Sequence, residues 1–331
     1  MSRIPFLSSF LILLLALLLS LAIGSVFLPL AELLAALTGH GADLTNSILW
    51  KIRLPRTVLI ALTGMALGGS GAAYQGLFRN PLADPYLIGV ASGAGLGAVI
   101  AMSVKWSYSF WGLMAVPLAA FLGALLTVFI VYLLARTGNV VPTTTLILAG
   151  VTVSSFAVSL TSFLMLRSDG ELRRAMSWLM GGSIQLGWMS IAAMLPYLFL
   201  GLSIILLNGH TLNLLQFGDE QAQQLGLNVS RAKTILLIAA SLATAAAVSF
   251  AGIIGFIGLV VPHLIRLWAG PDYRQLLPLS VLGGATALLV SDVLARVVLA
   301  PQEIPVGIIT ALAGAPFFLW VLRRAKNQGV W

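Results

Sequence analysis

The chain has 331 residues, of which 59% are hydrophobic and only 8% are charged, and its formal net charge is +8. A soluble domain of this length needs many more charged residues to cover its surface, so the composition indicates a polytopic membrane protein surrounded by lipid. The basic residues stand singly between apolar segments, which favours membrane topology and protein docking over nucleic-acid binding. Cysteine is absent from the sequence, which excludes disulfides and thiolate metal sites.

Apolar segments long enough to cross the hydrocarbon core, at about 20 residues each, predict an all-α fold with about ten transmembrane helices in a single domain, 1–331. The predicted spans are 7–28, 57–77, 87–104, 111–134, 144–166, 188–207, 234–253, 254–268, 276–299 and 305–322. We interpret the basic, apolar N-terminal segment as the first span rather than as a signal peptide. An even number of spans puts both termini on one side of the membrane. Lys and Arg are divided almost evenly between the two sides and do not fix the orientation alone.

Small residues at helical spacing mark the faces on which the spans pack. In lipid, close backbone approach through such residues is a main source of helix association. The second and third spans carry two such stripes, formed by Gly64, Gly68 and Gly71, and by Gly89, Gly93 and Gly97.

A short amphipathic helix is predicted at about 170–180, between the fifth and sixth spans. Leu172, Met176 and Leu179 form an apolar stripe beside Arg173 and Arg174. This pattern is typical of a helix that lies at the membrane interface.

The longest polar excursion on the side of the termini is the loop at about 208–233. Asp219 and Glu220 favour the positive end of a short helix, and Gly226 is suited to end it in the left-handed conformation. With the termini inside, this loop is cytoplasmic. From the residues alone, an ordinary solvated loop and a docking loop for a soluble partner are equally good readings.

Motifs for chemistry are missing from the sequence. It contains no GxxxxGK[ST] phosphate loop, HExxH motif or GxSxG elbow. The three histidines are far apart, which disfavours a shared metal site. Asp292 is the one candidate for an intramembrane acid, and Arg296 follows it on the same helical face, so the pair neutralises itself. This disfavours an ion-coupled secondary carrier, which remains the alternative, and a membrane-embedded enzyme is disfavoured further.

Six motifs, taken in order, resemble the permeases of bacterial ABC importers for iron-siderophores, haem and cobalamin, which have the type II importer fold. They are IRLPR (52–56), GLFRNPLADP (76–85), LILAGV (146–151), GDEQAQQLGL (218–227), GFIGLVVPHLIR (255–266) and EIPVGIITALAGAPFF (303–318). The resemblance implies a homodimer in the inner (plasma) membrane, with both termini cytoplasmic and no cofactor or catalytic site on this chain. It also implies two separate ATP-binding cassette subunits and a soluble periplasmic or lipoprotein substrate-binding protein, with no nucleic-acid partner.

The resemblance also implies roles for particular residues. The loop between the sixth and seventh spans would be the coupling helix that contacts the ATPase, through Gly218, Asp219, Glu220, Ala222, Leu225 and Gly226. The outer arginines that would pair with glutamates of the binding protein are Arg53, Arg56 and Arg296. The cytoplasmic gate would be formed by Asn80, Leu82, Thr143 and Thr144. The fifth and tenth spans would line the path. Ferric chelates are favoured as cargo because most members carry them, and haem and cobalamin stay open.

Overall fold

The computed structural model describes residues 4–24, 28–104, 106, 110–138, 141–167, 172–182 and 187–327, and its regular structure there is helical. In chain order the helices are α1 (Ile4–Ala22), α2 (Leu30–Leu37), α3 (Asp43–Ile48), the π-helical turn η1 (Leu49–Arg53), α4 (Leu54–Leu77), the 3-10 turn η2 (Pro85–Ile88), α5 (Val90–Met102), α6 (Phe110–Ala135), α7 (Thr143–Leu166), α8 (Leu172–Leu179), α9 (Trp188–Leu207), α10 (Gly209–Leu215), α11 (Asp219–Gln224), α12 (Val229–Ala251), α13 (Ile257–Ala269), α14 (Tyr273–Val297) and α15 (Val306–Asn327).

The described residues contain seven helical segments long and apolar enough to cross a membrane, together with three shorter apolar helices. The three shorter ones are α5, α13 and the apolar part of α15. Each of the ten predicted spans overlaps one of these ten segments, so the predicted all-α, polytopic fold is confirmed. The second segment is longer than predicted, because α3 and η1 continue directly into α4 and give one helical run over 43–77.

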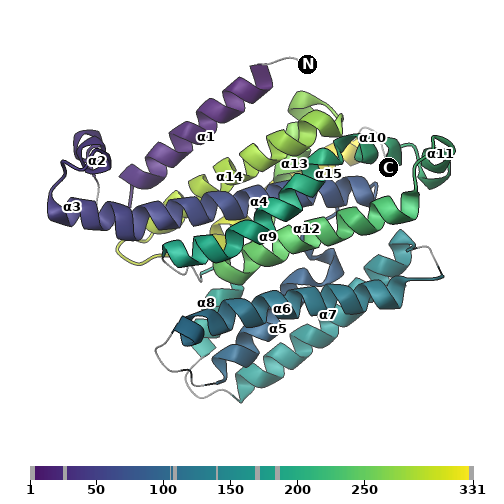
Figure 1. Ribbon diagram of the computed structural model, residues 1–331, viewed down its shortest axis with the longest axis horizontal. Helices are drawn as coiled ribbons and strands as arrows, with labels where there is room; N and C mark the ends of the chain where they lie inside the picture. Colours follow the sequence, from purple (N-terminus) through teal and green to yellow (C-terminus); the bar gives the residue numbers. More distant parts are fainter. Residues whose placement is uncertain are drawn as a thin grey trace.

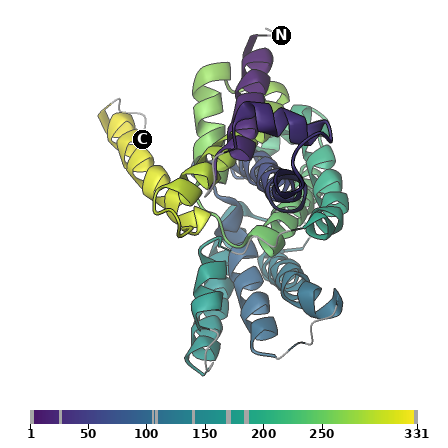
Figure 2. The ribbon, with the colours of Figure 1, turned by 90° about the vertical axis from the view of Figure 1, so that its left-hand side faces the viewer.

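The fold is built around α4, which is enclosed by α9, α12, α13 and α14 (Figures 1 and 2). The predicted glycine stripe explains the close approach of α4 and α14. A methyl group on Gly64 would overlap the carbonyl oxygen of Gly284, and one on Gly68 would overlap that of Ser280. The stripe on α5 acts in the same way, because a methyl group on Gly97 would overlap the Ala119 carbonyl of α6. Both stripes are therefore packing faces.

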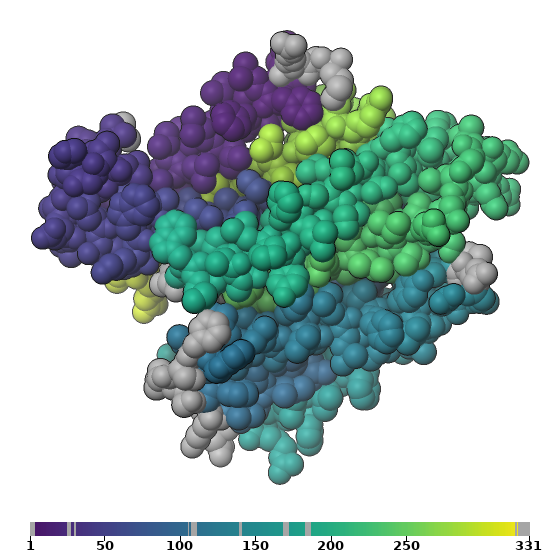
Figure 3. Space-filling view, in the orientation of Figure 1, coloured from purple at the N-terminus to yellow at the C-terminus, as the bar shows by residue number. Residues whose placement is uncertain are grey.

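A second group of helices, α5, α6 and α7, lies on one side of this assembly and joins it mainly through α6 and α12. Figure 3 shows the surface of α6 lying directly beside those of α9 and α12. The outermost helix of the group, α7, buries only 22% of its apolar window. α15 also projects from the body of the molecule (Figure 2). Both helices therefore have large faces that this chain does not cover.

The helix predicted at about 170–180 is present as α8, but the side chains it buries are not those of the predicted stripe. Trp178 is 1% exposed and Ala175 is also buried, whereas Leu172 and Met176 are 47% and 43% exposed. Leu172 and Met176 of the predicted stripe face away from the protein, whereas Leu179 is partly buried against the core and Trp178 occupies the interior.

The two ends of the molecule are different. α2 and α3 lie at one end, and α10 and α11 at the other (Figure 1). The first turn of α1 and the last turn of α15 both point toward the end that carries α10 and α11. This arrangement agrees with an even number of spans.

Candidate functional site

The polar loop between α9 and α12 folds into α10 and α11. Asp219 and Glu220 occupy the first turn of α11, as predicted, and Gly226 (φ +88°) follows its last turn. Two amides beyond the helix close it in a Schellman arrangement. They are Gly226 N, which donates to Gln223 O, and Leu227 N, which donates to Ala222 O, both at 3.0 Å. The predicted glycine cap is confirmed, and α11 is a closed two-turn helix.

α11 buries very little of itself. Ala222 is completely buried, but Leu225 is 62% exposed and Phe217, just before the helix, is 63% exposed. Phe217 and Leu225 are thus two large exposed apolar side chains that flank a short polar helix, and a protein partner would cover such groups. Phe217 was not among the predicted coupling residues. The signal that points to it is an aromatic residue inside a polar loop.

One ion pair ties α11 to the start of α12. Lys233 Nζ lies 2.5 Å from Asp219 Oδ2, and the lysine side chain is 13% exposed. The other carboxylate oxygen, Asp219 Oδ1, is buried and has no hydrogen-bond partner in the described part of the chain. Asp219 therefore has one oxygen in use and one available.

α10 is fixed to the start of α14 by the side chain of Asn213. Its amide nitrogen donates to Asp272 Oδ1 at 2.6 Å, and its amide oxygen accepts from the backbone of Tyr273 at 2.9 Å. Hydrogen bonds from Arg274 and Asn213 hold the pKa of Asp272 well below its usual range. The carboxylate is therefore charged at neutral pH and anchors α10 firmly.

The predicted gate residues Asn80 and Leu82 lie in the loop that joins α4 to η2. Asn80 Oδ1 accepts from Leu82 N at 2.9 Å, and Asp84 Oδ1 accepts from Tyr86 N at 2.8 Å, so each turn is held by a side chain. The Tyr86 hydroxyl donates to Ile254 O at 2.8 Å. Burial raises the pKa of Asp84 to about 6. The loop is ordered by its own polar groups and by the segment between α12 and α13.

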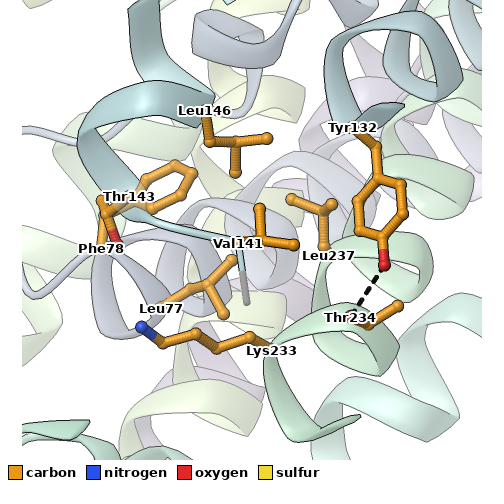
Figure 4. Close-up of a pocket in the computed structure, with 9 residues that line it drawn as sticks. All are labelled: Leu77, Phe78, Tyr132, Val141, Thr143, Leu146, Lys233, Thr234 and Leu237. Carbon is orange, nitrogen blue, oxygen red and sulfur yellow. Dashed lines mark hydrogen bonds between the residues drawn. The ribbon is translucent and has the colours of Figure 1, made fainter. Parts of the chain in front are cut away.

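The other two predicted gate residues begin α7, and Thr143 faces a narrow crevice shown in Figure 4. Lys233 and Thr234 of α12 form part of its wall, and Tyr132 OH lies 3.4 Å from Thr234 Oγ1. The remaining lining residues are Leu77, Phe78, Val141, Leu146 and Leu237. Thr144, by contrast, is exposed. The crevice brings the end of α4, the start of α7 and the lysine that holds α11 into one place.

Two of the three predicted outer arginines point into the protein. Arg53 and Arg296 are 6% and 5% exposed. Arg53 Nη1 donates to the carbonyls of Leu21 and Ala22, at 2.6 and 2.9 Å. Arg296 Nη1 donates to Ser20 O and Ile23 O, at 3.1 and 2.8 Å. Both cations therefore satisfy the carbonyls left open at the C-terminal end of α1.

Arg56 is closer to the surface and bridges two acids. Its guanidinium donates to Asp292 Oδ1 from Nη2 at 2.9 Å and to Glu303 Oε2 from Nη1 at 2.6 Å. Asp292 Oδ2 also lies 3.0 Å from Arg296 Nε, so the predicted Asp292–Arg296 pair is confirmed and is part of a larger network. The Asp292 side chain is completely buried, whereas that of Glu303 is 45% exposed. A hollow of about 160 Å³ lies beside Arg56 and Glu303.

The described residues contain no group of three His, Cys, Asp or Glu side chains that would hold a metal ion. What they contain is a bundle of apolar helices with a capped, partly apolar helix displayed at one end and a buried charge network at the other. These features are those of a membrane transport permease.

Comparison with known proteins agrees with this class. The model of the FecCD transport family matches residues 12–324. The chain is 49% identical to the cobalamin import permease BtuC of Halobacterium salinarum over 86% of its own length and 75% of the relative's. It is 43% identical to the hemin transport permease HmuU of Yersinia pestis, over 86% of each chain. A solved inward-facing structure of an ABC transporter of the metal-chelate type superposes with a TM-score of 0.85 at 31% identity, covering 97% of this chain and 99% of that one. The protein belongs to the FecCD transport family.

Proposed function

We propose that the protein is the permease subunit of a binding-protein-dependent ABC importer, and that separate ATP-binding cassette subunits dock on α11. The observation that carries this proposal is the exposure of α11: Leu225 and Phe217 are open, while Ala222 alone is fully buried. A helix this short gains little stability from packing on the rest of the chain, and a partner would cover the apolar side chains that flank it. Family membership supports the same assignment.

The uncovered face of α7 supports a homodimer with a path at its centre. Four hydroxyl groups form a stripe along this face, and each donates to the carbonyl four residues earlier. They are Thr152, Ser155, Ser159 and Ser162. Hydroxyl groups gain little from facing lipid and much from facing water or a second subunit. We place the second copy opposite α7, with the stripe lining the path.

The end that carries α2 and α3 is the proposed docking site for a soluble binding protein, with both termini and α11 on the cytoplasmic side of the plasma membrane. Arg56 is the docking residue best placed for this role, because it borders the open hollow and its pairing with Glu303 is partly exposed. Arg53 and Arg296 hold the position of Arg56 indirectly: both bind carbonyls of α1, and Arg296 also pairs with Asp292. An exposed arginine–carboxylate pair is worth about 0–1 kcal/mol, so it sets the register of docking more than its strength.

The proposed cargo is a large metal chelate, with cobalamin as the first candidate and haem or a ferric siderophore as the others. Relatives named for cobalamin import are 49% and 40% identical to this chain, and the hemin permease is 43% identical. These identities put cobalamin first, whereas the frequency of cargoes in the family favours ferric chelates. The importer would be reconstituted with the binding protein encoded by a neighbouring gene. Its uptake of cyanocobalamin, haemin and a ferric siderophore would decide among the three cargoes.

A charge placed on α11 tests the ATPase contact. Leu225→Asp is expected to reduce co-purification of the cassette ATPase and to abolish ATP-driven uptake, with the helical content unchanged. Leu299→Asp is the matched control, because Leu299 is similarly exposed, at 58%, just beyond α14. ATPase association equal in the two variants would contradict the assignment of α11. Uptake driven by a proton gradient without ATP would favour the secondary carrier instead.

A further inference from the structure

An unusual backbone conformation marks the junction between α4 and the gate loop. Arg79 has φ +50°, a left-handed value that a residue with a side chain rarely adopts. It follows the C-cap of α4 in a Schellman arrangement: Arg79 N donates to Gly76 O at 3.3 Å, and Asn80 N donates to Gln75 O at 3.1 Å. Glycine is the residue that normally fills this position, because it adopts left-handed angles without a steric cost.

The side chain of Arg79 reaches from this junction to α11. Its Nη1 lies 3.2 Å from the point where a Cβ on Gly218 would stand. Gly218 precedes the first residue of α11, and Arg79 precedes the gate residue Asn80. One side chain therefore spans the proposed ATPase contact and the proposed gate.

Two groups at this contact lack partners within the described residues. The Arg79 side chain is exposed, with no hydrogen bond or ion pair there, and Asp219 Oδ1 is buried without a hydrogen bond. Asp219 Oδ2 is already bound to Lys233. A buried carboxylate oxygen without a donor is costly, and a guanidinium is well suited to supply one. Arg79 Nη1 lies beside Gly218, and Asp219 is the next residue in the chain, so the two groups belong to neighbouring positions at the start of α11.

We propose that Arg79 is a positioning residue that links α11 to the gate loop by pairing with Asp219 Oδ1 during the transport cycle. This inference rests on the proposed importer function. In one state Asp219 holds Lys233 alone, and in the other it holds Lys233 and Arg79 together. Because Lys233 also lines the crevice that contains Thr143, the paired state would join α11 to both halves of the gate, the loop at Asn80 and the start of α7.

The natural absence of cysteine allows a gating measurement that needs no cargo. A single thiol is introduced with Leu82→Cys, and its labelling rate by a water-soluble maleimide is measured on the complex with the cassette ATPase, with and without ATP and vanadate. Adding Arg79→Gln is expected to reduce the nucleotide-dependent change in labelling rate about fivefold or more, while ATP hydrolysis and subunit association continue. In an Asp219→Asn background, Arg79→Gln is expected to cause no further change, because the pair is already broken.

Two further variants separate this link from a structural role. Arg79→Gly removes the side chain and the backbone strain together, so the melting temperature should stay equal or rise while the gating response is lost. If Arg79 served only stability, this variant would lower the melting temperature as well as the gating response. Arg231→Gln, which removes another exposed cation near the same end, should leave the response unchanged.

Three results would overturn the link. They are an unchanged response in Arg79→Gln, loss of ATPase association in that variant, which would make Arg79 a contact of the ATPase, and additive effects of the Arg79 and Asp219 substitutions. Failure of the importer function itself is distinguishable, because the unmodified chain would then show neither ATPase association nor a nucleotide-dependent labelling rate.

Discussion

The buried charge network around Asp292 allows a quantitative test. Asp292→Asn keeps the size of the side chain and removes its charge. The carboxylate is completely buried and stands between Arg56 and Arg296, whose side chains are 12% and 5% exposed. Removing one partner of a buried pair costs about 3–5 kcal/mol, because the remaining charge is left without compensation.

The remaining contacts of the two arginines place the expected loss at the lower end of that range, at about 3 kcal/mol. Arg56 keeps its bond to Glu303 at 2.6 Å, and Arg296 keeps the carbonyls of α1. The free energy of unfolding of the purified protein in a fixed detergent or lipid is the measurement. Glu303→Gln is the control: Glu303 is 45% exposed, so its loss should cost no more than about 1 kcal/mol.

Salt dependence provides a second comparison. The effect of Glu303→Gln should shrink in high salt, whereas that of Asp292→Asn should persist, because buried pairs are screened much less. An Asp292→Asn variant that loses less than about 1 kcal/mol, or no more than Glu303→Gln, would refute the reasoning that buried charge holds α1, α4 and α14 together.

Three other predictions concern stability. Gly68→Ala should cost about 1–3 kcal/mol of stability, because it overpacks α4 against a carbonyl of α14. Gly255→Ala should cost almost nothing, because a methyl group there meets nothing within 4 Å. Thermal unfolding of both variants tests the difference. The pKa of Asp84 is raised to about 6, so between about pH 4 and 6 the folded state keeps a proton that the unfolded state has lost. The free energy of unfolding should therefore fall as pH rises through that window. Asp84→Asn should remove this dependence when unfolding is measured across the same pH range. Trp178→Ala should cost about 3–5 kcal/mol and Leu172→Ala almost nothing, a difference that denaturant titration would measure and that equal losses would contradict.

The sequence allows the spans to be predicted because their signal is local. A run of apolar residues must be helical in lipid, whatever its neighbours are. The same holds for the end of α11, where Gly226 carries its own conformational preference. Both predictions depend on a few adjacent residues, and the structure confirms both.

Tertiary partners were beyond the reach of the sequence. Arg53 and Arg296 were expected at the outer surface, but their partners are carbonyls of α1, and no local pattern tells where a guanidinium finds its acceptor. On α8 the periodicity identified an apolar stripe, yet Trp178 lies on the buried face because the fold offers it an interior site. Arg79 is a third case: its left-handed backbone is unexpected for arginine, and no local pattern tells that its guanidinium lies beside Gly218.

The two ends of the molecule differ in how firmly they are held, and this bears on where movement occurs. At the end with the charge network, buried guanidinium groups tie α1, α4 and α14 together, and α4 and α14 touch backbone to backbone through glycine. At the other end α11 is held by one buried alanine and one partly exposed ion pair. Segments with few buried contacts open at the lowest free energy. If an ATPase docks on α11 as proposed, its force would displace α11 and the loop after α4 before it disturbed the α4–α14 contact. The bundle would then act as the rigid frame against which the proposed gate moves.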